Sequence, residues 1–543
     1  LTNLNIGTTS ANTFSGTAGT AIYFNDDGSG ANGITNVSIQ QNTFPTSGVI
    51  AIEFENVDLT GDLPPINLGS GNTNSDGMLI TDKYVYSHST LNESTYLYPG
   101  IAVLGTTATL ENGTATAYNT VAAAIAASAD NGTQTVFLGK GTYTEAIALN
   151  EAVSLKGKGQ TSTGTVLTNT LTVSGTAAGY SIQSIYFDVQ NTNGILVSAT
   201  PTSTGQLDIQ NNHFELGANE VGINITDNTL STNFPIYQCY FNFSDATATG
   251  IKLPNNQITT PAIFEVGSNT FSGTAAGTGV YISTTNSTGA STGEIRIYNN
   301  AFSSNVGNAI VFEDAVSNSN SLSGATINIY NGNDFNQSGY GIKINDVGTY
   351  SGFIGTTLPN TIDLYDTGAN TNFTAADIYG GAWYDLTGSS AVLYPSIQTA
   401  ENANTSATLY IGAGTYNENV TIDGATITTV TGNGTTCELV TGKDLTLGKD
   451  LTISGFSANT VVLVTGGQMS DAIVAVKTNG TININGSTTI SDNATINKAV
   501  AITESAASGA YSGTLTIATG GVAVSALDLT GNPAINIAPT DGI

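Results

Sequence analysis

The fold class predicted by the amino-acid sequence is all-β, a β-solenoid in which short strands stack coil upon coil. Three observations predict it: a composition rich in Gly, Thr, Asn and Ser, a short motif that recurs through the chain, and alternating strand segments between the copies. Repeats of about 20–50 residues that contain strands and no long helix are typical of solenoids.

The composition excludes most helical architectures. Charged residues make up 9% of the 543 residues, hydrophobic residues 39% and aromatic residues 8%. Coiled coils and helical repeats depend on Ala, Leu, Glu, Lys and Arg, so this low charged fraction argues against them. The hydrophobic content suffices for a packed core, and low charge is the opposite of the usual signature of disorder.

The charge balance limits the partners. The chain has 40 acidic and 11 basic residues, a formal net charge of −29, and its one arginine is Arg296. Phosphate backbones and anionic lipid surfaces are bound by clustered Lys and Arg, which the sequence lacks. It also lacks an apolar run of about 18 residues. We therefore expect no nucleic acid partner and no membrane insertion by this segment.

A motif of Asn, any residue and Phe recurs, followed a short distance later by Gly or Ala and then Ile or Val. From Phe214 onward the motif returns at a nearly regular interval, with its Phe at positions 214, 241, 271, 302 and 335. The copies are Asn12-Thr13-Phe14, Asn42-Thr43-Phe44, Asn212-His213-Phe214, Asn269-Thr270-Phe271, Asn300-Ala301-Phe302 and Asn333-Asp334-Phe335, with Cys239-Tyr240-Phe241 as a variant.

The motif predicts one coil per copy. Asn suits the bend between two strands because it tolerates left-handed backbone angles and bonds to nearby backbone. The Phe two residues later points the same way and enters the core, where it stacks on the Phe of the next coil. We therefore expect these side chains inside: Phe14, Phe44, Phe214, Phe241, Phe271, Phe302 and Phe335.

A second pattern marks where a solenoid begins. It consists of a short helix, a strand and a Gly-x-Gly-Thr-Tyr-x-Glu turn, and it occurs twice. The first copy has a helix near 118–128, a strand at 135–138 and the turn from Gly139 to Glu145. The second has a helix after Tyr394, a strand at 408–411 and the turn from Gly412 to Glu418.

This order resembles the opening of pectate-lyase-like right-handed parallel β-helix repeat proteins of the extracellular surface and adhesin type. The resemblance implies right-handed coils, a three-sheet cross-section and a helix that caps the first coil. Such openings occur in enzymes and in surface proteins, so the resemblance indicates architecture and not activity. The predicted fold is thus tandem right-handed parallel β-helix (β-solenoid) domains with short capping helices.

The spacing of the two openings predicts three segments. Residues 1–105 form the C-terminal part of one β-helix unit, 106–390 a complete unit with its capping helix near 118–128, and 391–543 the start of a further unit. Aromatic residues gather at the proposed boundaries, among them Tyr98, Trp383 and Tyr394. They are expected to pack the junctions, and a sugar-binding surface is the alternative interpretation.

Few residues suggest a bound ion or a modification. Asp26 and Asp27 form the densest carboxylate pair and are the candidate calcium ligands, although an Asp-Gly turn explains them without metal. No other cofactor is expected. The candidate acceptors for N-glycosylation are Asn36, Asn112, Asn224, Asn286, Asn336, Asn419 and Asn485.

No catalytic constellation is visible. Glycoside hydrolysis needs two carboxylates that flank the bond, and a lyase needs a cation and a base. Arg296 lies in an alternating strand without a second basic residue nearby, and His213 occupies the variable, solvent-facing position of the motif. Cys239 lies in an apolar strand and is expected to be a buried thiol.

The sequence therefore predicts a non-catalytic structural protein, built from tandem β-helix units and located outside the cell or on its surface. A surface layer, a filament or a stalk-like adhesin fits, with self-association of copies as the main interaction. Two alternatives stay open: a polysaccharide-degrading β-helix enzyme (a lyase or a glycoside hydrolase), and a carbohydrate-binding adhesin module.

Overall fold

The computed structural model describes most of the chain after residue 116 and short stretches before it. The described residues are 5–7, 12–15, 19–25, 37–39, 41–44, 49–55, 66–68, 73–74, 85–87, 102–106, 116–118 and 120–537, the last range without 129–131, 140, 158, 176–178, 191, 201–204, 228, 255–256, 259–260, 284–292, 314–325, 331, 346–359, 364–376, 386–389, 434–435, 486–488, 505–509, 526–527 and 530–533. The chain divides into two compact units, residues 1–253 with 261–277, and residues 254–260 with 278–543.

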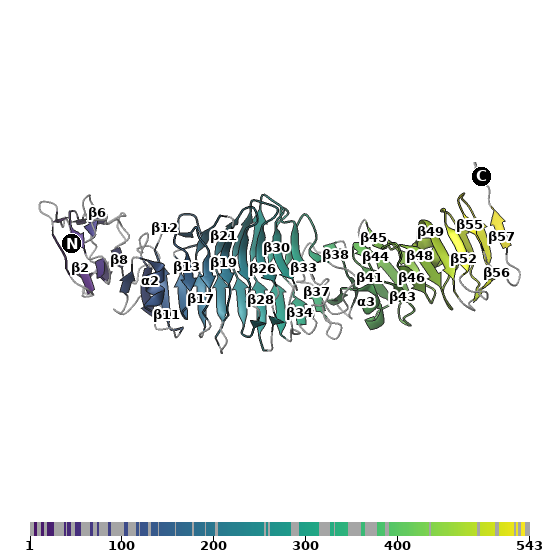
Figure 1. Cartoon of the computed structure of the whole chain (residues 1–543), viewed down its shortest axis with the longest axis horizontal. Helices are drawn as coiled ribbons and strands as arrows, with labels where there is room; N and C mark the ends of the chain where they lie inside the picture. The colour runs from purple at the N-terminus through teal and green to yellow at the C-terminus, as the bar shows by residue number, and fades with distance from the viewer. Residues whose placement is uncertain are drawn as a thin grey trace. The chain divides into compact units, whose positions relative to one another are not determined.

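The first unit contains a stack of parallel coils, each contributing one strand to each of three sheets (Figure 1). One sheet has the order β11 (Gln134–Leu138), β14 (Val153–Lys156), β17 (Tyr180–Gln183), β20 (Leu207–Gln210), β24 (Phe234–Tyr237) and β28 (Ile263–Gly267). The second has β12 (Gly141–Tyr143), β15 (Thr165–Leu167), β18 (Tyr186–Asp188), β21 (His213–Leu216), β25 (Tyr240–Phe243) and β29 (Thr270–Gly273). The third has β13 (Ile147–Leu149), β16 (Leu171–Val173), β19 (Asn193–Val197), β22 (Val221–Ile225) and β26 (Thr249–Pro254). The prediction of a parallel β-helix is confirmed.

The phenylalanines of the motif form a stack in the core of this unit. Phe214 is fully buried and lies parallel to Phe241, with 4.9 Å between the ring centroids. Phe241 lies 4.8 Å from Phe271 in the same way, and Phe187 extends the stack by one coil. The strand register places the rings opposite one another because each coil adds a whole motif. The predicted Phe stack is confirmed here.

The motif asparagines join consecutive coils through their side chains. Asn212 is fully buried; its Nδ2 donates to the Ile182 carbonyl at 2.9 Å, and its Oδ1 accepts from the Ile185 amide at 3.0 Å. The left-handed backbone angle expected of this Asn belongs to the residue before it, with φ 53° at Asn211 and 55° at Ser268. The Asn therefore lies at the bend as predicted. It suits this position because its side-chain amide bonds to the backbone of the neighbouring coil, and not because its own backbone is left-handed.

The Gly of the motif makes room for the Phe ring. A Cβ atom placed on Gly222 would lie 2.6 Å from the Gly250 carbonyl oxygen and 2.8 Å from the ring of Phe241. Contacts this short do not occur for real side chains, so the position needs Gly or a local shift of the strand. The recurring Gly and Phe are thus two parts of one packing arrangement.

Coils of the same kind occur near the N-terminus of the first unit. The parallel pairings are β1 (Asn5–Ile6) to β3 (Val37–Ile39) to β6 (Ile66–Leu68), β2 (Gly19–Asn25) to β5 (Val49–Glu55) to β8 (Val85–Ser87), and β4 (Thr43–Phe44) to β7 (Thr73–Asn74). Phe14, predicted inside, is only half-buried, and its amide donates to the Thr43 carbonyl of the next coil at 2.8 Å. The side chain of Phe44, also predicted inside, lies outside the described part of the structure.

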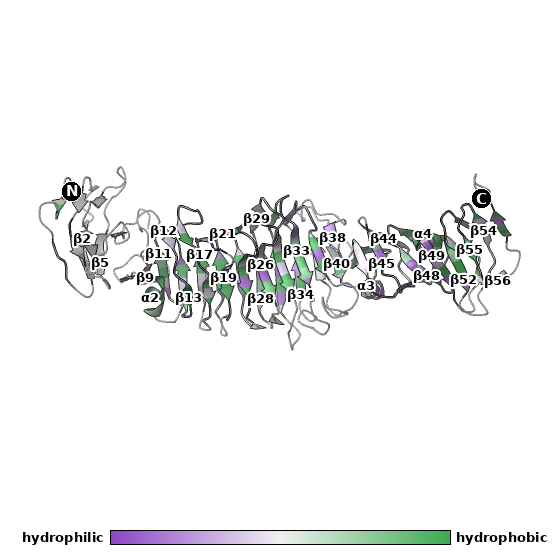
Figure 2. Ribbon diagram, turned by 45° about the horizontal axis from the view of Figure 1, so that its top comes forward, coloured by the Kyte–Doolittle hydropathy of each residue, from purple (hydrophilic) through white to green (hydrophobic). Residues whose placement is uncertain are grey.

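The second unit begins with parallel coils of the same type. Their strands are β30 (Thr278–Ser283), β31 (Glu294–Tyr298), β32 (Ala301–Phe302), β33 (Asn308–Glu313), β34 (Thr326–Ile329), β35 (Asp334–Phe335), β36 (Ile342–Asn345), β37 (Asn360–Asp363) and β38 (Ile378–Tyr379). Phe302 and Phe335 are buried and stack with centroids 5.4 Å apart. Hydrophilic and hydrophobic residues alternate along β34, whereas β33 has four consecutive hydrophobic residues between Asn308 and Glu313 (Figure 2).

A second stack follows in the same unit and has shorter coils. Its first strands are β41 (Thr408–Ile411), β42 (Gly414–Tyr416), β43 (Val420–Ile422), β44 (Thr429–Gly432), β45 (Cys437–Leu439), β46 (Asp444–Leu447), β47 (Thr452–Ser454) and β48 (Ala458–Leu463). The later ones are β49 (Val476–Ile484), β50 (Thr489–Ile490), β51 (Ala494–Ile496), β52 (Ala501–Glu504), β53 (Ala510–Tyr511), β54 (Thr514–Ile517), β55 (Ala523–Val524), β56 (Asp528–Leu529) and β57 (Ala534–Ile537). Aliphatic side chains fill most of its core.

The two stacks of the second unit are joined by a β-hairpin, β39 (Ala382–Asp385) and β40 (Ser390–Tyr394). β40 pairs antiparallel with β37, a strand of one stack, and β39 pairs antiparallel with β41, the first strand of the next. Trp383 and Tyr394, predicted to pack a junction, are buried in this hairpin. Tyr98 lies outside the described residues.

The same hairpin precedes the stack of the first unit. There β9 (Ala102–Thr106) pairs antiparallel with β10 (Thr116–Tyr118) and with β11. Tyr118 lies opposite Ala102 as Tyr394 lies opposite Ala382, so the two hairpins share one register. In each case a short helix follows the hairpin, α2 (Val121–Ala126) in the first unit and α3 (Ile397–Ala403) in the second, which confirms both predicted helices.

The Glu of the Gly-x-Gly-Thr-Tyr-x-Glu turn holds the N-terminus of the preceding helix. Glu145 accepts a hydrogen bond of 2.9 Å from the Val121 amide, and Glu418 accepts one of 2.7 Å from the Ile397 amide. These are amides that a helix cannot satisfy within itself. Burial raises the pKa of Glu418 although Ser396 and the helix amides donate to it.

A third helix, α4 (Met469–Ala475), is held in the same way by Asp492, whose carboxylate accepts from the Met469 and Ser470 amides. Within the described residues, none of the helices has the length and hydrophobicity needed to cross a membrane.

Candidate binding surface beside Glu215

The outer face of β18, β21 and β25 carries a row of stacked rings. Tyr186, His213 and Tyr240 lie opposite one another in the strand register. Their ring centroids are 4.6 Å apart in both steps. His213 was expected to face solvent; it does lie on the outer face, but only 17% of its side chain is exposed because the two tyrosines cover its faces.

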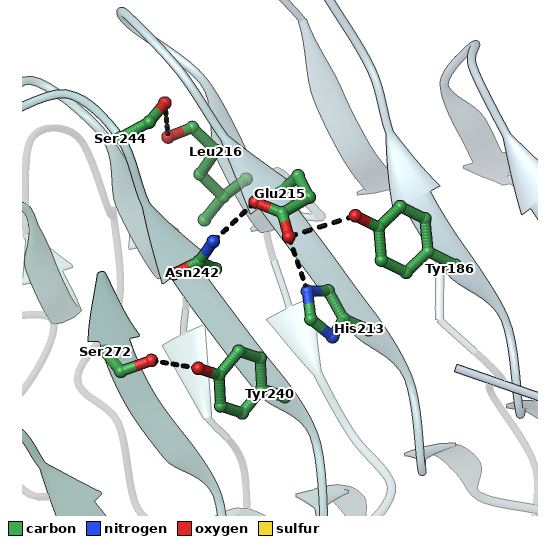
Figure 3. Close-up of polar contacts among 8 residues, drawn as sticks. All are labelled: Tyr186, His213, Glu215, Leu216, Tyr240, Asn242, Ser244 and Ser272. Carbon is green, nitrogen blue, oxygen red and sulfur yellow. Dashed lines mark hydrogen bonds and ion pairs between the residues drawn. The ribbon is translucent and has the colours of Figure 1, made fainter. Parts of the chain in front are cut away.

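Glu215 lies beside this row and accepts hydrogen bonds from its neighbours (Figure 3). The Tyr186 hydroxyl donates to Oε1 at 3.0 Å, and Nε2 of His213 lies 2.9 Å from the same oxygen. Nδ2 of Asn242 donates to Oε2 at 2.6 Å. Tyr186, His213 and Asn242 come from β18, β21 and β25, which belong to three consecutive coils. The parallel register therefore brings all three side chains to one carboxylate.

These contacts keep the carboxylate charged and the phenol neutral. Partial burial alone would raise the pKa of Glu215, but hydrogen bonds from His213, Asn242 and Tyr186 outweigh it and lower that pKa. Burial and the adjacent carboxylate together raise the pKa of Tyr186. A negative charge is therefore fixed on the outer face at neutral pH.

A hollow of about 420 Å³ opens next to Glu215. Its lining includes the carboxylates of Asp188, Glu215 and Glu220 and the polar side chains of Gln190 and Ser244. Glu220 is 4% exposed, and its Oε2 accepts a hydrogen bond of 2.6 Å from the Gly217 amide. The described residues that line the hollow include no Lys or Arg, and their oxygens offer acceptors for hydroxyl or ammonium groups.

The arrangement around Glu215 has a counterpart in the second unit. Glu313 accepts hydrogen bonds from the Tyr281 hydroxyl at 2.8 Å and from Asn345 at 3.3 Å. Burial and the Glu313 carboxylate raise the pKa of Tyr281 to about 12. A carboxylate held by a Tyr and an Asn of neighbouring coils is thus a recurring feature of these outer faces, and a hollow adjoins the one at Glu215.

Glu294 is a related case that includes the one arginine. It accepts hydrogen bonds from Asn328 at 2.7 Å and from the Tyr330 hydroxyl at 3.0 Å, and it pairs with Arg296 at 2.7 Å. The hydrogen bond from Arg296 lowers the pKa of Glu294. Arg296 is therefore part of an ion pair on the outer face, in agreement with its predicted outward position.

The predicted calcium ligands Asp26 and Asp27 lie outside the described residues. In the part of the chain that the structure describes, no group of three or more His, Cys, Asp or Glu side chains is arranged to hold a metal ion. Both cysteines are buried and free, and burial raises the pKa of Cys239 to about 12, which confirms the prediction of a buried thiol.

The predicted glycosylation acceptors separate into three groups. Asn36, Asn112 and Asn286 lie outside the described residues. Asn224 lies within β22, where its Nδ2 donates to Asn193 at 3.0 Å. Asn336, Asn419 and Asn485 are exposed and stay candidate acceptors.

The sequence analysis did not single out Glu215, Tyr186 or Asn242. A usable signal was present, since Tyr186, His213 and Tyr240 follow one another at intervals of one coil. Comparisons with known proteins add no name: no family model matches the chain, and no curated protein and no solved structure matches it. The resemblance to pectate-lyase-like β-helices therefore stays a prediction.

Proposed function

We propose that this chain is part of a non-catalytic structural protein of the cell exterior, built from tandem β-helix units. The observation that carries the proposal is the hairpin joint of the second unit. Because β40 pairs with β37 and β39 pairs with β41, backbone hydrogen bonds run from one stack into the next. An enzyme gains little from such continuity, whereas a load-bearing or spacing element depends on it.

The surface chemistry supports an exterior location and self-association. Only 11 residues of 543 are Lys or Arg, which leaves few cleavage sites for trypsin-like proteases. The net charge of −29 keeps copies apart in solution until a specific contact or a bridging cation overcomes the repulsion. Assembly into a surface layer, a filament or a stalk is the role that these two properties favour together.

The test is to lengthen the chain. A variant that carries a second copy of residues 106–390 after residue 390 is compared with the original chain by electron microscopy. About ten added coils at a strand spacing of about 4.8 Å should lengthen the particle by about 45–50 Å. An unchanged length would contradict the role of a spacer. Association of the native protein that depends on concentration or calcium is the second expected result.

Carbohydrate binding is the second candidate, favoured by the hollow beside Glu215. Carboxylate, amide and hydroxyl groups are suitable partners for sugar hydroxyls, and concave sites with a few placed polar groups are the usual place for small ligands. Its three carboxylates disfavour acidic polysaccharides by charge repulsion. The expected ligand is therefore a neutral or amine-bearing sugar chain.

A panel of neutral, basic and acidic oligosaccharides, titrated by calorimetry, tests this candidate. Asp188→Asn should weaken any binding, because it removes a negative charge from the lining while the three partners of Glu215 stay in place. Glu313→Gln, which changes the similar carboxylate of the second unit, is the matched control and should leave binding unchanged. Failure of every oligosaccharide to bind would remove this candidate and leave the structural role untouched.

A further inference from the structure

The hydroxyl of Tyr416 lies at the centre of the joint between the two stacks of the second unit. Its oxygen is 2.7 Å from the Gly412 carbonyl oxygen and 3.0 Å from that of Gly381, and the Gly381 amide donates to it at 3.1 Å. Gly381 precedes the hairpin strand β39, whereas Gly412 belongs to the first coil of the next stack. The Tyr416 side chain is fully buried.

Backbone hydrogen bonds surround this hydroxyl and cross the joint. The Gly412 amide donates to the Gly381 carbonyl at 2.7 Å, and the Gly380 amide donates to the Ala413 carbonyl at 2.7 Å. The Ala413 amide donates to the Ile378 carbonyl at 3.0 Å. The joint is therefore connected on a second side, apart from the antiparallel pairing of the hairpin.

The backbones approach each other too closely here for a side chain. A Cβ atom on Gly412 would lie 2.9 Å from the Ile378 carbonyl oxygen, and one on Gly381 would lie 2.9 Å from that of Tyr394. The two glycines of the joint therefore let the strands meet, and the Tyr416 hydroxyl bonds to the backbone of both glycines.

We propose that the Tyr416 hydroxyl stabilises this joint: it holds the end of one stack against the start of the next, and without it the joint opens locally more often while both stacks stay folded. Removal of a buried hydroxyl that serves backbone groups on both sides leaves those groups without this partner, which is costly in a buried place. This inference concerns the joint itself and holds whether or not the protein has the structural role proposed above.

The earlier copy of the turn provides a matched control. Tyr143 occupies the position of Tyr416, is buried, and donates its hydroxyl to the Gly139 carbonyl at 3.0 Å, as Tyr416 does to Gly412 in the later copy. Tyr143→Phe removes the same atom from the same motif in the other unit. It should leave the joint of the second unit unchanged.

The experiment is amide hydrogen exchange of the full chain, followed by mass spectrometry. In Tyr416→Phe, peptides that contain Gly380, Gly381, Gly412 and Ala413 should exchange about tenfold faster, because their local opening loses one buried hydrogen-bond partner. Peptides from β33 and β48, in the two stacks, should keep their rates. Tyr143→Phe should change none of these peptides.

Two results would overturn the proposal. One is unchanged exchange at the four joint residues in Tyr416→Phe. The other is faster exchange throughout β33 and β48, because Tyr416 would then stabilise whole stacks and not the joint. Gly412→Ala is the second variant: it keeps the Tyr416 hydroxyl but crowds the Ile378 carbonyl. It should therefore also speed the exchange of the four joint residues. Unchanged exchange in this variant would count against the close approach of Gly412 to Ile378.

Discussion

The chain contains two types of coil, which fill their cores with different side chains. The longer type forms the first unit, and the shorter type forms the stack that starts at β41 in the second unit. Phe214 lies opposite Phe241 in the first unit, whereas Ile482 lies opposite Ile502 after a shorter stretch of chain. The longer coil encloses stacked rings and bonded asparagines; the shorter one encloses mainly Val, Ile and Leu. Larger core side chains therefore accompany the longer coil, while the parallel register is common to both.

The difference also appears on the outer faces. In the first unit the outward positions of β18, β21 and β25 carry Tyr186, His213 and Tyr240, and Glu215 is held beside them. In the shorter coils Thr408, Thr429 and Thr452 lie opposite one another. The candidate binding surface thus belongs to the longer type of coil, although both types share the backbone geometry.

The largest expected effect comes from the ring stack. Phe241→Ala removes a ring that stacks on both Phe214 and Phe271, and should lower the free energy of unfolding of its stack by about 3–5 kcal/mol. Ile482→Val in the aliphatic core should cost about 0.5–1.5 kcal/mol. Native-state hydrogen exchange in increasing urea measures both. Equal losses would show that the rings contribute no more than the aliphatic side chains.

The glycine beneath the ring is the next position. Gly222→Ala forces a methyl group towards the Gly250 carbonyl and the Phe241 ring, and should destabilise its coils by about 1–3 kcal/mol. Gly520→Ala, in the other unit, meets nothing within 4 Å and should change stability by less than about 0.5 kcal/mol. Stability is compared through the urea midpoints of the two variants. An unchanged midpoint in Gly222→Ala would show that the coil relaxes to accept the methyl group.

The bend asparagine has a natural comparison within the chain. Asn212→Ala leaves the Ile182 carbonyl and the Ile185 amide without this partner in a buried place, which should cost about 1–3 kcal/mol. Cys239 occupies the same motif position one coil later and is buried there. Asn212→Cys should therefore cost less than Asn212→Ala in the same unfolding measurement; the reverse order would contradict the role assigned to the side chain.

The smallest expected effect is an alkaline loss of stability. The pKa of Tyr281 is raised from 10.0 to about 12 in the folded chain, so its contribution is present below pH 10 and is lost as the pH rises from 10 towards 12. The urea midpoint should fall over this range. Tyr281→Phe should flatten the fall, and an identical pH profile in the variant would exclude the Tyr281–Glu313 contact as its source.

Much of the coil architecture could be predicted because it repeats. The spacing of Phe214, Phe241 and Phe271 indicates one coil per motif, and the buried, parallel rings confirm it. The two Gly-x-Gly-Thr-Tyr-x-Glu turns accompany predicted helices that both formed. Phe14 belongs to a full copy of the motif and is nevertheless only half-buried, because burial depends on which coil lies above and which below.

The candidate site was harder to predict because its parts come from different coils. Tyr186, Glu215 and Asn242 have no motif of their own, and they meet because each lies on the outward face of its strand at neighbouring register positions. The densest acidic pair in the sequence is instead Asp26 and Asp27, which became the predicted calcium ligands. The signal that indicates the ring row, and Glu215 beside it, is the recurrence of Tyr186, His213 and Tyr240 at outward positions one coil length apart.

The sequence by itself determined the strand class, the coil length and the inward set of side chains, since these follow from local alternation and from a period that any stacked coil must obey. Only the tertiary structure decided which outward groups meet, that Glu145 and Glu418 reach back to helix amides, and that a hairpin passes the sheet from β37 to β41. The physical reason is that these contacts depend on the stagger between coils, which small changes in bend and loop length alter without changing the period.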